Sequence, residues 1–106
     1  MNNLFDLPPN LSAQERFELL LDCPGLRIER IISIGQTTPV GQWYDQAQDE
    51  WVVLLQGNAI LGYEDGTQQP LNSGDYVFLP AHQKHRVEYT SAEPPCIWLA
   101  IHGDLH

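Results

Sequence analysis

Two segments, each rich in polar residues and bounded by turn residues, most constrain what this 106-residue chain can fold into. Residues 41–57 read GQWYDQAQDEWVVLLQG, and residues 74–86 read GDYVFLPAHQKHR. Because side chains alternate between the two faces of a β-strand, every second residue of the first segment shares one face. These residues are Tyr44, Gln46, Glu50, Val52 and Leu54. A face that is polar at its start and apolar at its end is typical of a strand that lines a cavity with a packed floor.

The second segment supplies His85, followed on the same face by Val87 and Tyr89. If both segments are strands of one barrel, Glu50 and His85 meet inside it. This meeting is the central hypothesis from the sequence.

From Leu26 onward, short segments rich in β-branched and aromatic residues alternate with turn residues. Short strands with no helix between them predict an all-β antiparallel sandwich or barrel. The predicted strands are residues 27–34, 43–56, 58–64, 67–71, 75–79, 85–90 and 96–102. Residues 51–55 are apolar on both faces, so this strand needs cover on both sides. The cover is an N-terminal helix, an N-terminal arm or a second subunit.

Residues 1–25 are predicted to form an arm and one short helix packed on the barrel of residues 26–106. Pro8 and Pro9 keep the arm extended. The spacing of Ser12 and Glu15 fits a capping box, which predicts a helix over residues 12–22 that ends before Pro24–Gly25.

Composition restricts the partners and the number of domains. A chain of this length holds one core. The formal charge is −9 with only five Lys and Arg residues, which disfavours nucleic acid and anionic membranes as partners. No apolar run reaches the roughly 20 residues of a membrane span. Cys23 and Cys96 could form one bridge, but two free thiols in a reducing cytoplasm explain them better.

The spacing of the two segments resembles that of the cupin superfamily, whose members are small jelly-roll barrels (double-stranded β-helices). Glu50, six residues and Gly57 match the end of the first cupin motif. Gly74, five residues, Pro80 and then His85 match the second. The resemblance spans residues 26–102 and implies a cupin jelly-roll barrel, here with one short N-terminal helix.

Four positions depart from the cupin motifs. Tyr44 and Gln46 occupy the two histidine positions of the first motif, His82 replaces a glycine of the second, and Tyr89 replaces its asparagine. In metal-binding cupins the ligands are both first-motif histidines, the glutamate and the second-motif histidine.

The resemblance therefore leaves Glu50 and His85 as good metal ligands and Gln46 as a weak oxygen donor, with Tyr44 a poor one. His82 could add a second imidazole only if its turn directs the ring inward. This donor set implies weak binding of a divalent transition metal, with Mn, Fe, Ni, Cu and Zn not distinguished.

Three other interpretations of the same residues remain open. The polar residues Tyr44, Gln46, Glu50 and His85 could form a hydrogen-bonded plug that holds no ligand. Glu50 and His85, with Tyr44 as the acid, could carry out acid–base catalysis without a metal, as some cupin sugar epimerases and isomerases do. The barrel could also be a non-catalytic binding or sensor module for a small polar molecule. The few basic residues disfavour nucleotide-sugar substrates, and we see no glycine loop or Cys/His cluster for another cofactor.

The remaining aromatic and histidine residues are assigned structural places. Trp43 and Trp51 share an outer strand face with Asp45 and Asp49, which we interpret as a packing surface, most simply in a homodimer. His102 and His106 are expected on the surface, and Cys96 is expected to be buried. Residues expected in the core or cavity wall are Val52, Leu54, Tyr63, Phe78, Val87 and Trp98.

Overall fold

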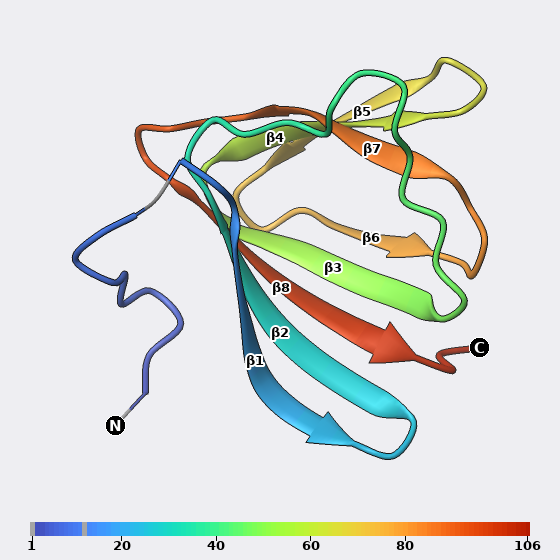
Figure 1. The fold of residues 1–106 in the computed structure, drawn as a ribbon, viewed down its shortest axis with the longest axis horizontal. Helices are drawn as coiled ribbons and strands as arrows, with labels where there is room; N and C mark the ends of the chain where they lie inside the picture. The colour runs from blue at the N-terminus through green and yellow to red at the C-terminus, as the bar shows by residue number, and fades with distance from the viewer. Residues whose placement is uncertain (1, 12) are drawn as a thin grey trace.

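The computed structural model describes residues 2–11 and 13–106, and within them it contains eight β-strands in two sheets (Figure 1). The five-stranded sheet has the order β1-β2-β8-β3-β6, and the three-stranded sheet has the order β5-β4-β7. All pairings are antiparallel. The strands are β1 (Arg16–Cys23), β2 (Leu26–Ser33), β3 (Asp49–Gln56), β4 (Asn58–Tyr63), β5 (Gln68–Asn72), β6 (Tyr76–Leu79), β7 (His85–Thr90) and β8 (Cys96–Gly103). The all-β prediction is confirmed.

The predicted N-terminal helix is wrong, because residues 16–23 form strand β1 at the edge of the larger sheet. β1 pairs with β2 along its whole length, with one irregularity between Leu19 and Leu21. The apolar residues of this segment fit a short helical stripe and a strand equally well, and the pairing with β2 decides between them. Pro24–Gly25 makes the turn between the two strands instead of ending a helix. Ser12, the predicted cap, lies outside the described residues.

The strand predicted over residues 43–56 is shorter than expected, since β3 begins only at Asp49. Residues 45–48 form no strand, and Tyr44 makes an isolated bridge to His85 on β7. Tyr44 therefore reaches the second sheet through its backbone rather than through β3.

The hydrophobic core lies between the sheets, where the inward-facing residues of the central strands pack together. β8 is flanked by β2 and β3, and its residues Trp98 and Ala100 are buried. The core cluster consists of Val52, Leu54, Ala59, Leu61, Leu71, Leu79, Cys96, Trp98 and Ala100, with Tyr63 and Val87 packed against it. Most of the predicted core residues are therefore confirmed.

Phe78 is an exception, because 42% of its surface is exposed. It pairs with Trp51, on the opposite face from Val52. The ring of half-buried Trp51 lies 5.5 Å from that of Tyr76 on this outer face.

Asp49 also differs from its predicted exposed position. It is buried, and its carboxylate accepts hydrogen bonds from the backbone N–H groups of Ala81 and Leu105. The exposed ring of His106 lies 2.7 Å from the same carboxylate. Asp49 thus connects β3 to the turn after β6 and to the C-terminal segment.

The N-terminal segment is held to the larger sheet by the buried side chain of Arg30, which donates hydrogen bonds to the backbone carbonyls of Leu4 and Asp6. Both cysteines are free thiols and Cys96 is buried, as expected, while Cys23 is exposed. Residues 2–11 and 13–106 contain no helix that is long and apolar enough to cross a membrane.

Candidate functional site

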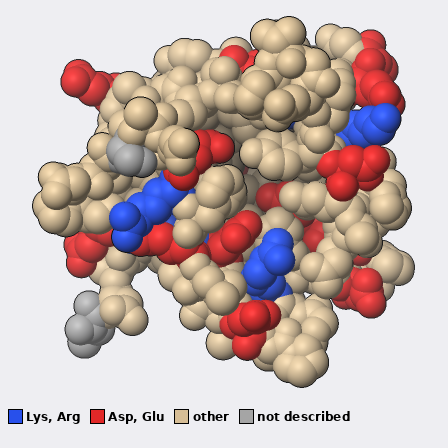
Figure 2. Space-filling view, viewed as in Figure 1, with Lys and Arg blue, Asp and Glu red and all other residues tan. Residues whose placement is uncertain are grey.

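A cavity of about 70 Å³ lies between the two sheets and is lined by residues from β1, β2, β3, β4, β6, β7 and β8 and from the loops before β1 and β3. The face shown in Figure 2 is hollowed near its centre, and acidic side chains are visible inside the hollow. The lining residues are Glu15, Phe17, Glu29, Ile31, Tyr44, Gln46, Glu50, Val52, Leu61, Leu79, His85, Val87, Trp98 and His102. The cavity thus has an apolar floor and a group of polar side chains.

Glu50 is the buried carboxyl of this cavity. It lies near the start of β3, where its cross-strand neighbours are His102 on β8 and Leu79 on β6. Burial, together with the negative charge of Glu29, raises the pKa of Glu50 to about 7, and the opposing effect of Arg27 is smaller. Glu50 can therefore gain or lose a proton near neutral pH.

His85 reaches the cavity from β7 in the other sheet. Its Nε2 atom lies 3.9 Å from Oε1 of Glu50, and only 8% of each side chain is exposed. The Nδ1 atom lies 3.0 Å from the carbonyl oxygen of Gln83, which can only accept a hydrogen bond. Nδ1 therefore donates, and the neutral ring presents its unprotonated Nε2 toward Glu50. Burial lowers the pKa of His85, which favours this neutral form.

Tyr44 is fixed against His85 by backbone and ring contacts. The two residues exchange backbone hydrogen bonds of 2.8 and 3.1 Å, and their rings stack with centroids 5.5 Å apart. Burial raises the pKa of Tyr44, with smaller contributions from Glu15, Glu50 and Glu29. The phenol is thus held in its protonated form, as a hydrogen-bond donor.

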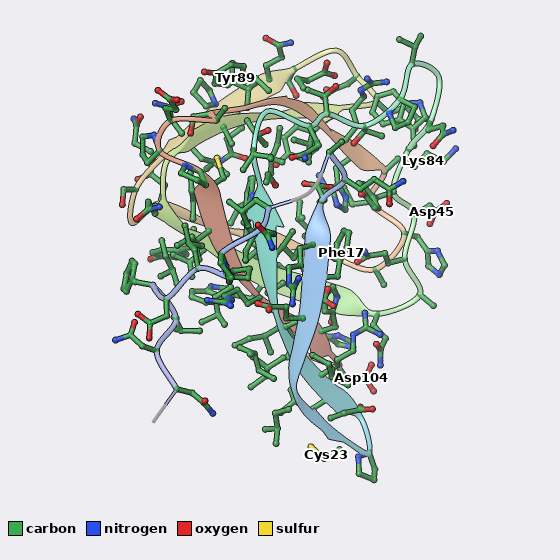
Figure 3. All side chains as sticks on the ribbon, turned by 60° about the vertical axis from the view of Figure 1, so that its left-hand side comes forward. Phe17, Cys23, Asp45, Lys84, Tyr89 and Asp104 are labelled. Atoms are coloured by element: carbon green, nitrogen blue, oxygen red, sulfur yellow. The ribbon has the colours of Figure 1, made fainter. Side chains whose placement is uncertain are left out.

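The other two residues predicted from the motifs lie in different places. Gln46 lines the cavity. The side chain of His82 is 71% exposed and pairs with Asp45 at 2.9 Å, and His82 does not line the cavity. In Figure 3, Asp45 and Lys84 lie on loops at one edge of the molecule. The backbone N–H of His82 donates to the carbonyl of Gln46, so the two loops are joined through their backbones.

The sequence interpretation missed three polar lining residues. His102, expected on the surface, is buried, and its Nε2 lies 2.9 Å from Oε1 of Glu29. Glu15 accepts a hydrogen bond from the Ser33 hydroxyl, and burial raises its pKa. The sequence could have placed His102 inside, because in the predicted last strand it shares a face with Trp98, which was expected in the core or cavity wall. No comparable signal pointed to Glu15, which was assigned to a helix.

The donor set does not fit a tightly held transition metal. Among residues 2–11 and 13–106, no three His, Cys, Asp or Glu side chains are placed to share one ion. Glu50 and His85 are the two strong donors that face each other, and Gln46 could add only an amide oxygen. The Nε2 atom of His102 is directed at Glu29 instead. A site with two strong ligands is weaker than the four-ligand set of metal-binding cupins that the resemblance implies.

The comparison with protein families covers the part of the chain that holds both motifs. The family model described as "Cupin domain" matches residues 32–102, which include β3, both motifs and nearly all of β8. The chain belongs to the cupin family. The comparison with curated proteins gave no match.

Several solved structures resemble this chain. A protein of Ralstonia eutropha JMP134, provisionally named a mannose-6-phosphate isomerase, is 44% identical, with a TM-score of 0.92 over 98% of this chain and 97% of that chain. A cupin superfamily protein of Desulfitobacterium hafniense DCB-2 is 17% identical, with a TM-score of 0.74 over 92% and 84%. Fe(II) HppE is 16% identical, with a TM-score of 0.68 over 83% of this chain and 49% of that chain. The last two similarities concern the fold alone.

The raised pKa of Glu50 predicts a pH-dependent effect of Glu50→Gln on stability. Between about pH 4.5 and pH 7 the unfolded chain releases this proton while the folded chain keeps it. The contribution of Glu50 to stability is therefore complete below pH 4.5 and is lost as the pH rises through 7. The free energy of unfolding of the variant, relative to the parent, should increase by about 3 kcal/mol from pH 4 to pH 8.

Urea unfolding at both pH values measures this change. Glu64→Gln is the control, because 64% of the Glu64 side chain is exposed. Its relative stability should change by less than about 0.5 kcal/mol. An equal stability difference for Glu50→Gln at both pH values would contradict the burial of the Glu50 carboxyl.

Proposed function

We propose that this cupin binds a small organic molecule in the cavity between its sheets, and that Glu50 exchanges a proton with that molecule beside His85. One observation supports the proposal most directly. Two titratable side chains from opposite sheets, each 8% exposed, approach within 3.9 Å at the cavity. Perturbed titratable groups that converge in a cavity are typical of active sites.

Each polar residue has a distinct role in this proposal. Glu50, with a pKa of about 7, takes a proton from the substrate as a carboxylate and returns it as a carboxylic acid. Neutral His85 accepts a hydrogen bond at Nε2 and so orients a substrate hydroxyl or the protonated Glu50. Tyr44 donates a hydrogen bond to the substrate oxygen on which negative charge develops. The reaction class is an isomerisation or epimerisation by proton transfer.

The name of the Ralstonia protein agrees with this reaction class, since sugar isomerisation can proceed by proton transfer. A phosphorylated substrate is less well supported here, because the cavity lining contains three glutamates and no Lys or Arg. We therefore carry over the type of reaction to this proposal and not the phosphate group.

Proton transfer can be tested before the product is known. The protein is incubated in D₂O with small neutral sugars, amino sugars and keto acids, and deuterium incorporation is followed by NMR. Glu50→Gln should slow the exchange of any active compound by at least about 100-fold, the usual contribution of a general acid or base. The matched control Glu64→Gln should exchange at the parent rate.

Deuterium exchange that persists in Glu50→Gln would refute the assignment of Glu50.

The mostly apolar wall of the cavity favours a second function, which is ligand binding without catalysis. A compound that raises the melting temperature of the parent, but not of a variant altered in the pocket, and that never exchanges would establish this second function.

The weak divalent-metal site inferred from the motifs stays a prediction. The donor set leads us to expect no tightly held metal. Protein purified without a histidine tag, loaded with Mn, Fe, Ni, Cu or Zn and dialysed, should retain less than about a tenth of an equivalent. A stoichiometric metal that is lost in Glu50→Gln combined with His85→Ala would contradict this expectation.

We also propose that the chain forms a homodimer in the cytoplasm, and the surface of β1 supports the first part. β1 is an edge strand whose residues Phe17, Leu19, Leu20 and Leu21 are each about half exposed. Unpaired edges with apolar side chains favour association. Leu21→Glu should therefore lower the sedimentation coefficient from the dimer value to the monomer value, and a monomeric parent would contradict the proposal. The two free thiols agree with a reducing compartment.

A further inference from the structure

The charge of the cavity lining is unbalanced, and this imbalance bears on the ligand. Glu15, Glu29 and Glu50 line the cavity, and the lining residues include no Lys or Arg. Arg27 lies beside His102 in the register of the sheet and affects Glu50 electrostatically, but it does not line the cavity. A phosphate or carboxylate entering the cavity would meet three carboxyl groups in its lining, while Arg27, the basic side chain that acts on Glu50, lies outside the lining.

Glu50 is the glutamate of this group that is left for a ligand. Glu15 accepts a hydrogen bond from Ser33, and Glu29 pairs with His102. Within residues 2–11 and 13–106, the structure gives the Glu50 carboxyl no hydrogen bond, although 92% of its side chain is buried. Its neighbour His85 lies 3.9 Å away, beyond hydrogen-bonding distance. Glu50 lines the cavity, so a ligand there can donate a hydrogen bond to its carboxyl.

Aromatic side chains form part of the cavity lining. Phe17, Tyr44 and Trp98 line the cavity together with His85. The indole N–H of Trp98 donates to Ser33, so Trp98 contributes its ring and not a hydrogen-bond donor. Figure 3 shows Phe17 near the start of β1. Aromatic rings attract ammonium groups through their negative faces, and they add to the attraction of the carboxylates.

Building on the proposed function of this pocket, we propose that its ligand carries an ammonium group that binds between the Glu50 carboxylate and the aromatic walls. At about 70 Å³ the cavity is far smaller than the roughly 300–1,000 Å³ of sites for drug-sized ligands. The ligand is thus an amine of a few heavy atoms, or a larger amine that inserts only its ammonium end.

The test is an NMR titration at constant ionic strength with propylamine, 1-propanol and propionate, three probes of nearly equal size and different charge. At pH 8, propylamine should bind at least about tenfold more tightly than either of the others. Glu50→Gln should remove this preference, and the surface control Glu64→Gln should retain it.

The outcomes separate this inference from the proposed function. Equal or tighter binding of propionate, or no binding of propylamine, would overturn the ammonium inference. If deuterium exchange into a neutral substrate still required Glu50, the proposed function of the pocket would be supported even without an ammonium ligand. Propylamine binding that is unchanged in Glu50→Gln, with exchange also unchanged, would place the ligand elsewhere and overturn both.

Discussion

The structure depends on one electrostatic constraint, the burial of the Glu50 carboxyl in an apolar cavity opposite His85. Removing a carboxylate from water is unfavourable, and at this site it raises the pKa of Glu50 to about 7. β3 places Glu50 on the inner face of one sheet, and β7 brings His85 from the other. The same alternation places Val52 and Leu54 below Glu50 as the packed floor. The core and the buried carboxyl are therefore consequences of one strand pattern.

Tyr44 and Gln46 stand at the two histidine positions of the first cupin motif and determine the chemistry of the pocket. Tyr44 lies beside His85, held by two backbone hydrogen bonds and by ring stacking. Gln46 lines the cavity. A phenol and an amide at these positions offer hydrogen bonds in place of two imidazole ligands. The pocket is therefore better suited to hydrogen bonding than to strong metal coordination.

The sequence predicted the barrel and placed Glu50 and His85 on segments that meet, because strand alternation and turn residues act locally. It did not predict β1, since a short apolar run suits a helix or a strand until its partner β2 is known. It also placed His102 on the surface, whereas the register that sets His102 beside Glu50 comes from pairing between distant strands. Asp49 is buried because its partners, Ala81 and Leu105, are remote in sequence.

The most direct measurement of the central claim is the titration of the Glu50 side-chain carboxyl by carbon-13 NMR, with the signal assigned by its loss in Glu50→Gln. The account predicts a midpoint near pH 7. A midpoint near 4.5, the ordinary value for glutamate, would show a solvated carboxyl and would contradict the shared buried pocket of Glu50 and His85.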